Sequence, residues 1–163
     1  RPVLRSGALV GDSIFVTGSL GASIKEHHWS FTPRIKEAQQ LHSLCHLNSM
    51  IDLSDGIASD IRHITSSSNV GCLIWEREIP ISEDVATTMT QRSRINAALG
   101  DGEDFELLFT VNQNDADSLK SQSEIPVHEI GIVTPADLGE RLELANGEVV
   151  LLPEMGWKHW IES

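Results

Sequence analysis

The apolar positions of the chain follow two periods, of about two and about 3.6 residues, which predict strands and helices in alternation. Short apolar or β-branched runs predict strands over residues 13–18, 49–53, 70–76, 104–111 and 128–134. Helical spacing or helix-start signals predict helices over residues 34–47, 55–66, 81–93 and 114–122. The pair Asn146-Gly147 predicts a β-hairpin within residues 141–152.

Strands that alternate with helices are typical of an α/β domain, in which helices cover a sheet. The hairpin adds an antiparallel pair, so the sheet is predicted to be mixed. The 163 residues are enough for a single domain with a buried core. The chain begins "RPVLRSGALV", without an initiator methionine, so we expect it to be part of a longer protein.

The charge balance narrows the classes of partner. The formal net charge is −12, and an acidic surface repels the phosphates of nucleic acids and anionic lipids. No run of about 18 apolar residues predicts a membrane span, so neither nucleic acid nor a membrane is expected as a partner. Two cysteines without a recognisable secretory signal favour a reducing, cytoplasmic location. A phosphate ligand would need Mg²⁺ to supply positive charge.

The stretch "MIDLSDGIASDI", residues 50–61, joins a predicted strand to a predicted helix. Side chains alternate along a strand, so Asp52 is expected to point away from the apolar face. Ser54 or Asp55 is then expected to cap the helix, whose N-terminus presents free N–H groups. Carboxylates, a hydroxyl and N–H donors in one place suit a phosphate bridged by Mg²⁺. The same spacing also suits a plain helix cap beside an exposed aspartate.

Two further stretches carry candidate chemistry. In "GDGEDFELLF", residues 100–109, two glycines allow close approach of a ligand, and Glu103 can accept hydrogen bonds from a cationic or amino-bearing group. A solvated acidic turn accounts for the same composition. In the tail "GWKHWIES", Trp157 and Trp160 can stack on a planar heterocycle. They can also simply pack against the domain.

The sequence has no GxxxxGK[ST] loop, no GxGxxG and no kinase HRD or DFG signature, so any ATP must bind by another architecture. It does contain, in this order, "RSGALVGDSIFVTGSLG", "FTPRI", "IDLSDGIASDI", "GDGEDFELLF" and "GWKHW". Together these segments resemble the C-terminal domain of the thiamine-monophosphate kinases. That family lies within the superfamily of aminoimidazole ribonucleotide synthetase, selenophosphate synthetase and the hydrogenase maturation protein. The runs "GEDFELLF" and "GWKHW" narrow the resemblance to the thiamine enzyme.

The resemblance implies a three-layer domain over residues 1–163, with a mixed sheet and flanking helices, like the C-terminal domain of aminoimidazole ribonucleotide synthetase. It also implies a preceding N-terminal domain with further Mg²⁺-binding aspartates, nucleotide contacts and a homodimer interface, so the isolated chain is expected to be inactive. The implied roles are Mg²⁺ binding by Asp52 and Asp55, ATP binding by Arg5 and Ser54, and substrate binding by Glu103 and Trp157. Asp101 and Phe105 depart from the family pattern, which has a glycine and a tyrosine there.

The activity that the resemblance implies is transfer of the γ-phosphoryl group of ATP to thiamine monophosphate, giving thiamine diphosphate and ADP in thiamine diphosphate biosynthesis. Phosphoryl transfer depends mainly on positioning and charge neutralisation. A phosphate monoester is already mostly ionised near neutral pH, because its second pKa is about 6, so no catalytic general base is predicted. The alternatives are another ATP-using superfamily member, of selenophosphate or purine-biosynthesis type, and a non-catalytic module that binds a thiamine phosphate or a partner protein.

Overall fold

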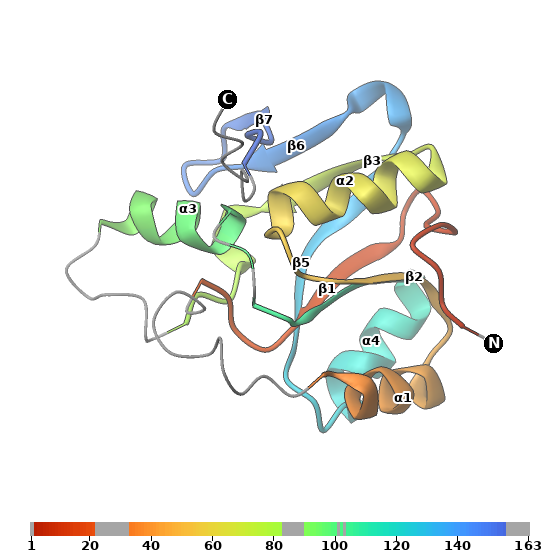
Figure 1. Cartoon of the computed structure of the whole chain (residues 1–163). Helices are drawn as coiled ribbons and strands as arrows, with labels where there is room; N and C mark the ends of the chain where they lie inside the picture. The colour runs from red at the N-terminus through yellow and green to blue at the C-terminus, as the bar shows by residue number, and fades with distance from the viewer. Residues whose placement is uncertain (1, 22–32, 83–89, 101, 103, 156–163) are drawn as a thin grey trace, which may run out of the picture.

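The computed structural model describes residues 2–21, 33–82, 90–100, 102 and 104–155. Within them, one seven-stranded sheet carries helices on both faces (Figure 1). The strands are β1 (Ser13–Thr17), β2 (Leu47–Asp52), β3 (Gly71–Trp75), β4 (Leu107–Val111), β5 (Val127–Thr134), β6 (Glu140–Glu143) and β7 (Val149–Leu151). The helices are α1 (Ile35–Leu44), α2 (Ile57–Ser68), α3 (Gln91–Gly100) and α4 (Gln113–Gln122), with the 3-10 turns η2 (Glu76–Glu78) and η3 (Ala136–Leu138).

The sheet has the strand order β2-β4-β1-β5-β3-β6-β7. Its neighbours pair antiparallel, except that β3 and β6 run parallel, so the predicted mixed sheet is confirmed. The predicted hairpin is β6 and β7. Its loop is closed by Gly147, which has φ 86° and donates its N–H to the carbonyl of Leu144 at 2.8 Å.

The sheet forms the middle of three layers. All five residues of β1 are buried, because helices cover both faces of this central strand. Ile14 and Val16 belong to the core cluster that includes residues of α2 and α3. Phe15 belongs to the opposite cluster, with residues of α1 and α4, and stacks on Phe109 with ring centroids 5.6 Å apart. The alternation along β1 thus places two helices on each face (Figure 1).

Two predicted elements are shorter in the structure. The helix predicted over residues 34–47 ends at Leu44, because Cys45 is extended (φ −150°, ψ 167°) and leads directly into β2. The strand predicted over residues 104–111 begins only at Leu107. Phe105 has φ 52°, a left-handed conformation that interrupts an extended strand.

The helix α3 lies further along the chain than its prediction. Of the predicted range 81–93, residues 83–89 lie outside the described residues. The described helix follows Thr90, whose Oγ1 accepts from the N–H of Ser93 at 3.2 Å, and it continues to Gly100. Its apolar residues fall in its second half and include Ile95 and Leu99, both buried. That clustering gives no regular helical stripe, so residues 94–100 were not predicted as helix.

No helix among the described segments combines the length and the apolar character that crossing a membrane requires.

Candidate functional site

The "DLSDG" turn connects the end of β2 to the start of α2. Asp52 is the last residue of β2 and is exposed, while Ser54 and Asp55 lie in the turn and are half-buried. Gly56 precedes the helix with φ 93°. Two carboxylates and a hydroxyl therefore lie within four residues, and all of them reach solvent.

The predicted cap of α2 is wrong. The N-cap residue is Gly56, and no side chain caps the helix. Instead, Oδ2 of Asp60 accepts hydrogen bonds from the N–H groups of Ser54 and Asp55, both at 3.0 Å. These two N–H groups therefore do not remain available for a phosphate. The Ser54 hydroxyl and the Asp55 carboxylate are correspondingly not used as caps.

Asp60 itself was not predicted as a site residue. It is 1 % exposed, and burial raises its pKa to about 6. The signal in the sequence is an acidic residue in the first turn of a helix, which is common and is usually explained by the helix dipole. Only the folded turn shows that this carboxylate bonds backward to the "DLSDG" backbone.

The second motif packs directly on the first. Gly102 has φ 63°, and a Cβ added there would lie 2.6 Å from the carbonyl oxygen of Ser54 and 3.2 Å from Cα of Asp55. Gly56 is equally confined, since a Cβ added there would lie 2.7 Å from the carbonyl oxygen of Leu99. The two glycines allow the "GDGED" and "DLSDG" segments to meet backbone to backbone. Glu103 lies outside the described residues, between the described Gly102 and Asp104.

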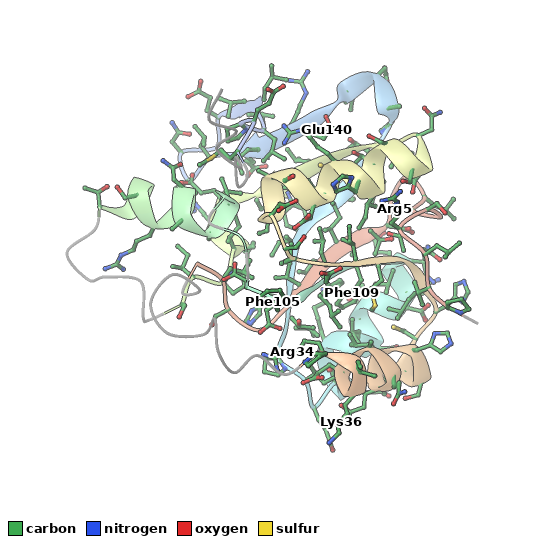
Figure 2. The ribbon with its side chains drawn as sticks, in the orientation of Figure 1. Arg5, Arg34, Lys36, Phe105, Phe109 and Glu140 are labelled. Carbon is green, nitrogen blue, oxygen red and sulfur yellow. The ribbon has the colours of Figure 1, made fainter. Side chains whose placement is uncertain are left out.

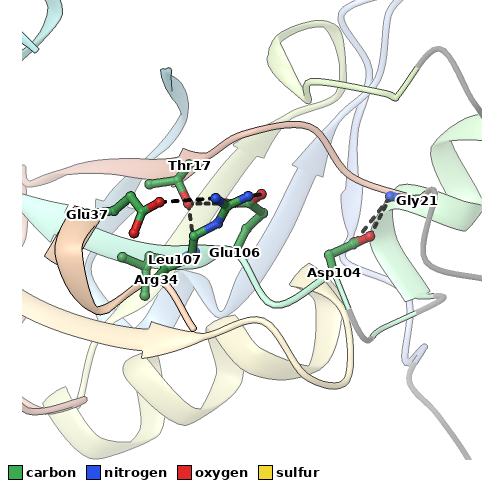
Figure 3. Close-up of polar contacts among 7 residues, drawn as sticks. All are labelled: Thr17, Gly21, Arg34, Glu37, Asp104, Glu106 and Leu107. Carbon is green, nitrogen blue, oxygen red and sulfur yellow. Dashed lines mark hydrogen bonds and ion pairs between the residues drawn. The ribbon is translucent and has the colours of Figure 1, made fainter. Parts of the chain in front are cut away.

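The approach to β4 continues this contact. The N–H of Phe105 donates to the carbonyl of Leu53 at 3.0 Å, and the N–H of Leu53 donates to the carbonyl of Glu106 at 2.8 Å. The carboxylate of Asp104 accepts from the N–H of Gly21, at 3.0 and 3.2 Å for its two oxygens (Figure 3). The segment after β1 is therefore anchored beside the same two turns.

A buried carboxylate, Glu106, organises the start of β4 (Figure 3). Glu106 is 6 % exposed. Its Oε2 accepts from the Thr17 hydroxyl at 2.6 Å, and its Oε1 pairs with Nη2 of Arg34 at 2.6 Å. Nη1 of Arg34 also pairs with Glu37 at 3.1 Å. The hydrogen bond to Glu106 is the main reason that the pKa of Arg34 is raised.

A hollow of about 360 Å³ opens beside this network. It is lined by Pro33, Arg34, Ile35, Ala38, Asp52, Phe105 and Leu107. Most of its lining is apolar, and Asp52 and Arg34 bring one charge of each sign. Asp52 therefore reaches a recess that can take part of a ligand, and Arg34 and Phe105 lie on the same side of the molecule, near the start of α1 (Figure 2).

Arg5 lies apart from these groups. Next to it, the carbonyl of Leu4 accepts from the N–H of Met50 at 2.9 Å, and Gly7 donates its N–H to the hydroxyl of Ser68 at 3.1 Å. Arg5 is exposed on this segment, toward the C-terminal end of α2, whereas the "DLSDG" turn is at the other end of that helix (Figure 2). Within the described residues, no hydrogen bond or ion pair joins Arg5 to the turn.

The described part of the C-terminal tail runs toward the two turns. Arg62 of α2 donates from Nη2 to the carbonyl of Leu152 at 2.8 Å and from Nη1 to that of Pro153 at 3.4 Å. Met155 then packs on Gly100, where an added Cβ would lie 3.0 Å from Cβ of Met155. The tail therefore passes the "GDGED" segment at the last residue that is described. Trp157 lies outside the described residues.

The donor atoms suit a hard cation only in part. Within the described ranges, no group of three or more His, Cys, Asp or Glu residues could hold a metal ion. In nucleotide sites, however, Mg²⁺ needs only one or two protein carboxylates and takes its other ligands from phosphates and water. Asp52 and Asp55 fit that requirement in number and in chemical type.

Sequence comparison assigns the chain to a family. The thiamine-monophosphate kinase of Buchnera aphidicola is 31% identical over 182 aligned positions, which cover 97% of this chain. That of Rhodopirellula baltica is 35% identical over 136 positions, or 82% of this chain. The chain belongs to the thiamine-monophosphate kinase family. It spans about half the length of these relatives, 55% of the Buchnera protein and 43% of the Rhodopirellula protein. No family model matches it.

Solved structures agree with this assignment. The thiamine-monophosphate kinase of Stenotrophomonas maltophilia is similar with a TM-score of 0.74 and 26% identity, over 91% of this chain and 54% of its own. AaThiL, solved with AMPPCP and TMP, is similar with a TM-score of 0.73 and 26% identity, over 97% of this chain and 54% of its own. The hydrogenase maturation protein HypE in complex with ATP gives 0.72 at 18% identity, which shows a shared fold. The predicted fold class, that of the aminoimidazole ribonucleotide synthetase superfamily, is therefore confirmed.

Proposed function

We propose that residues 1–163 are the C-terminal domain of a longer thiamine-monophosphate kinase, which transfers the γ-phosphoryl group of ATP to thiamine monophosphate and releases thiamine diphosphate and ADP. The observation that carries the proposal is the contact between the "DLSDG" and "GDGED" turns at Gly102 and Ser54. That contact joins the two motifs that resemble the family's metal and substrate segments. The family relationship and the AMPPCP and TMP bound to AaThiL support the same reaction.

Each proposed site residue has a defined task. Asp52 and Asp55 hold Mg²⁺ through carboxylate oxygens, and the Ser54 hydroxyl bonds an ATP phosphate. Arg5 offsets phosphate charge from the N-terminal segment. Glu103 and Trp157 bind the thiamine part of the acceptor. Arg5 lies away from the turn in this chain, so its role requires the nucleotide to extend from the "DLSDG" turn toward it.

The reaction needs little proton chemistry from the protein. Bound Mg²⁺ would neutralise charge on the phosphates. The acceptor phosphate is already largely ionised near neutral pH, so the side chains act by binding and alignment rather than as a general base. Carboxylates that bind a metal ion, with no general base required, fit this chemistry. A preceding N-terminal domain supplies the remaining ligands in this proposal, and the isolated chain is expected to be inactive.

The cellular setting is part of the same proposal. The full-length protein is expected to be a cytoplasmic homodimer, with no nucleic-acid or membrane partner. The thiols of Cys45 and Cys72 are free and buried in the described structure, consistent with a reducing compartment. Sedimentation of the full-length protein tests the homodimer, because a monomer would contradict it.

The decisive experiment is an assay of the protein extended to its natural start. Thiamine monophosphate, ATP and Mg²⁺ are supplied together, and thiamine diphosphate and ADP are measured, with a parallel reaction in EDTA. Metal-dependent formation of both products is the expected result. ATP cleavage only with selenide or a formylglycinamidine substrate would favour another superfamily activity. Binding of thiamine monophosphate by a folded protein that consumes no ATP would favour a non-catalytic module.

A further inference from the structure

The side chain of Asp60 is inside the protein, but its hydrogen bonds go to the "DLSDG" turn. Asp60 lies in the first turn of α2 and is 1 % exposed. One oxygen, Oδ2, accepts from two consecutive N–H groups, those of Ser54 and Asp55, each at 3.0 Å. An ionised carboxylate oxygen is an acceptor only and can take both bonds. The backbone of the turn is thereby fixed to the helix that follows it.

This arrangement changes what the turn can offer a ligand. In an ordinary N-cap, a Ser or Asp side chain is occupied by a backbone N–H. Here Asp60 satisfies the N–H groups of Ser54 and Asp55 from within the helix, and Gly56 occupies the cap position. The Ser54 hydroxyl and the Asp55 carboxylate therefore remain free of capping bonds and reach solvent beside Asp52.

We propose that Asp60 is a positioning residue for metal and nucleotide binding: it holds the turn so that Asp52, Ser54 and Asp55 present their oxygens together. The inference rests on the proposed function, because it assigns those three oxygens to Mg²⁺ and ATP. Asp60 does not touch the ligands itself. Groups that orient metal ligands typically change metal affinity by about 10-fold to 100-fold when they are removed.

The test uses the full-length enzyme and the variants Asp60→Ala and Asp60→Asn. Binding of Mn²⁺, a spectroscopic probe of the Mg²⁺ site, is measured by electron paramagnetic resonance with AMPPCP present. Asp60→Ala removes both bonds, so we expect Mn²⁺ affinity to fall by about 10-fold to 100-fold. Asp60→Asn keeps one amide oxygen that can accept from the turn, so its loss is expected to be smaller. The Mg²⁺ concentration for half-maximal turnover should rise in the same order.

Asp12 provides a matched control. It is 3 % exposed, and its Oδ2 also accepts two hydrogen bonds, from the N–H of Leu9 at 2.9 Å and from Nδ2 of Asn48 at 2.8 Å. Asp12→Ala should lower thermal stability in the same way but leave Mn²⁺ affinity at the wild-type value. Equal losses of Mn²⁺ affinity in Asp60→Ala and Asp12→Ala would overturn the inference, as would wild-type affinity in folded Asp60→Ala.

Two further outcomes are also decisive. If Asp60→Ala does not fold, the folded Asp60→Leu enzyme replaces it, because leucine fills a similar space but accepts no hydrogen bond, and Mn²⁺ affinity equal to wild type would then reject the positioning role. Mn²⁺ binding with AMPPCP does not involve the acceptor. A wild-type enzyme that binds Mn²⁺ with AMPPCP but does not phosphorylate thiamine monophosphate would therefore contradict the proposed function and leave the test of Asp60 intact.

Discussion

Arg34 and Glu106 form an ion pair of 2.6 Å across 72 positions of the sequence. The pair joins the residue before α1 to the residue before β4. The glutamate is largely buried, with a side chain 8% exposed, whereas the side chain of Arg34 is 38% exposed. Removing the arginine would leave a buried carboxylate whose remaining side-chain partner is the Thr17 hydroxyl.

The first prediction concerns this pair. Loss of one partner of a fully buried ion pair costs roughly 3–5 kcal/mol, and solvent screening at the half-exposed Arg34 reduces that figure. We therefore expect Arg34→Ala to lower the free energy of unfolding by about 2 kcal/mol, measured by urea denaturation. Lys36→Ala, which removes an exposed cation two residues away, should change it by less than about 0.5 kcal/mol. Equal effects of the two substitutions would contradict the role of the pair.

The second prediction concerns Gly102. An alanine there must adopt φ near 63°, and its Cβ would meet the carbonyl oxygen of Ser54 at 2.6 Å. Gly147→Ala is the matched control, because Gly147 has φ 86° but nothing lies within 4 Å of its Cβ position. The left-handed backbone alone should cost about 1–2 kcal/mol in both variants. Only Gly102→Ala should also push the two motif turns apart.

Urea denaturation and steady-state kinetics of the full-length enzyme separate these two effects. Both variants should lose stability, with the larger loss in Gly102→Ala. The apparent affinity for thiamine monophosphate and the turnover should fall only in Gly102→Ala. Identical kinetics in the two variants would mean that the contact between the turns does not matter for the reaction.

The third prediction concerns the proposed metal ligands. Asp52→Asn and Asp55→Asn keep the size of each side chain and remove its charge, so each should reduce turnover by roughly 100-fold or more. The unfolding midpoint should change little for Asp52→Asn, because Asp52 is exposed. Asp117→Asn, at a side chain that is 83% exposed on α4, controls for the change in net charge. Wild-type turnover in both site variants would reject the metal assignment.

The fourth prediction is a pH dependence of thiol reactivity. Burial raises the pKa of Cys45 to about 11 and that of Cys72 to about 12. The thiolate is the reactive form, so alkylation of the native chain by iodoacetamide at pH 8 should be roughly 100-fold slower than in urea. Between pH 8 and 10 the native rate should keep rising with pH, while the rate in urea levels off above a pKa of about 8.5. The Cys45→Ala variant isolates Cys72, and fast labelling of that variant at pH 8 would contradict the prediction.

The local pattern was enough to predict most elements. Ile57, Ile61 and Ile64 recur at helical spacing, and all three are buried on one face of α2. The continuous apolar run of β1 predicts a strand, and it is apolar on both sides because helices cover both faces of this central strand. The pattern was less reliable on α1. Ile35 continues the apolar spacing of that helix but is 62% exposed, where it borders the hollow beside Asp52.

The site was harder to predict, because its geometry depends on contacts between distant segments. The motif turns could be named from the sequence, but the contact of Gly102 with Ser54 arises only when β2 and β4 pair. Glu106 lies within a quoted motif, yet an acidic residue in a strand gives no sign of a partner 72 positions earlier. The sequence predicts a cap of α2 by Ser54 or Asp55. In the structure, the Asp60 side chain instead accepts hydrogen bonds from the backbone N–H groups of those two residues. In each case the missing information is the partner rather than the residue.

The last prediction follows from the position of the C-terminal tail. Arg62 lies on α2, the helix that begins at the "DLSDG" turn, and it donates hydrogen bonds to the carbonyls of Leu152 and Pro153. It therefore fixes the point from which the chain continues past Met155 to Trp157. If Trp157 binds the thiamine part of the substrate, Arg62→Met should raise the KM for thiamine monophosphate by about tenfold, equivalent to 1.4 kcal/mol of binding free energy. The KM for ATP and the turnover should change much less.

Arg77 supplies the control for this prediction. It also donates hydrogen bonds to a backbone carbonyl, that of Ala145 in the β6–β7 loop, but it does not hold the tail. Arg77→Met should therefore leave the KM for thiamine monophosphate at the wild-type value. The double variant Arg62→Met with Trp157→Ala then separates two explanations. If Arg62 acts by placing the tail, adding its substitution to Trp157→Ala should raise that KM little further, because coupled residues are not additive. Fully additive effects would mean that Arg62 influences the substrate by a route that does not include the tail.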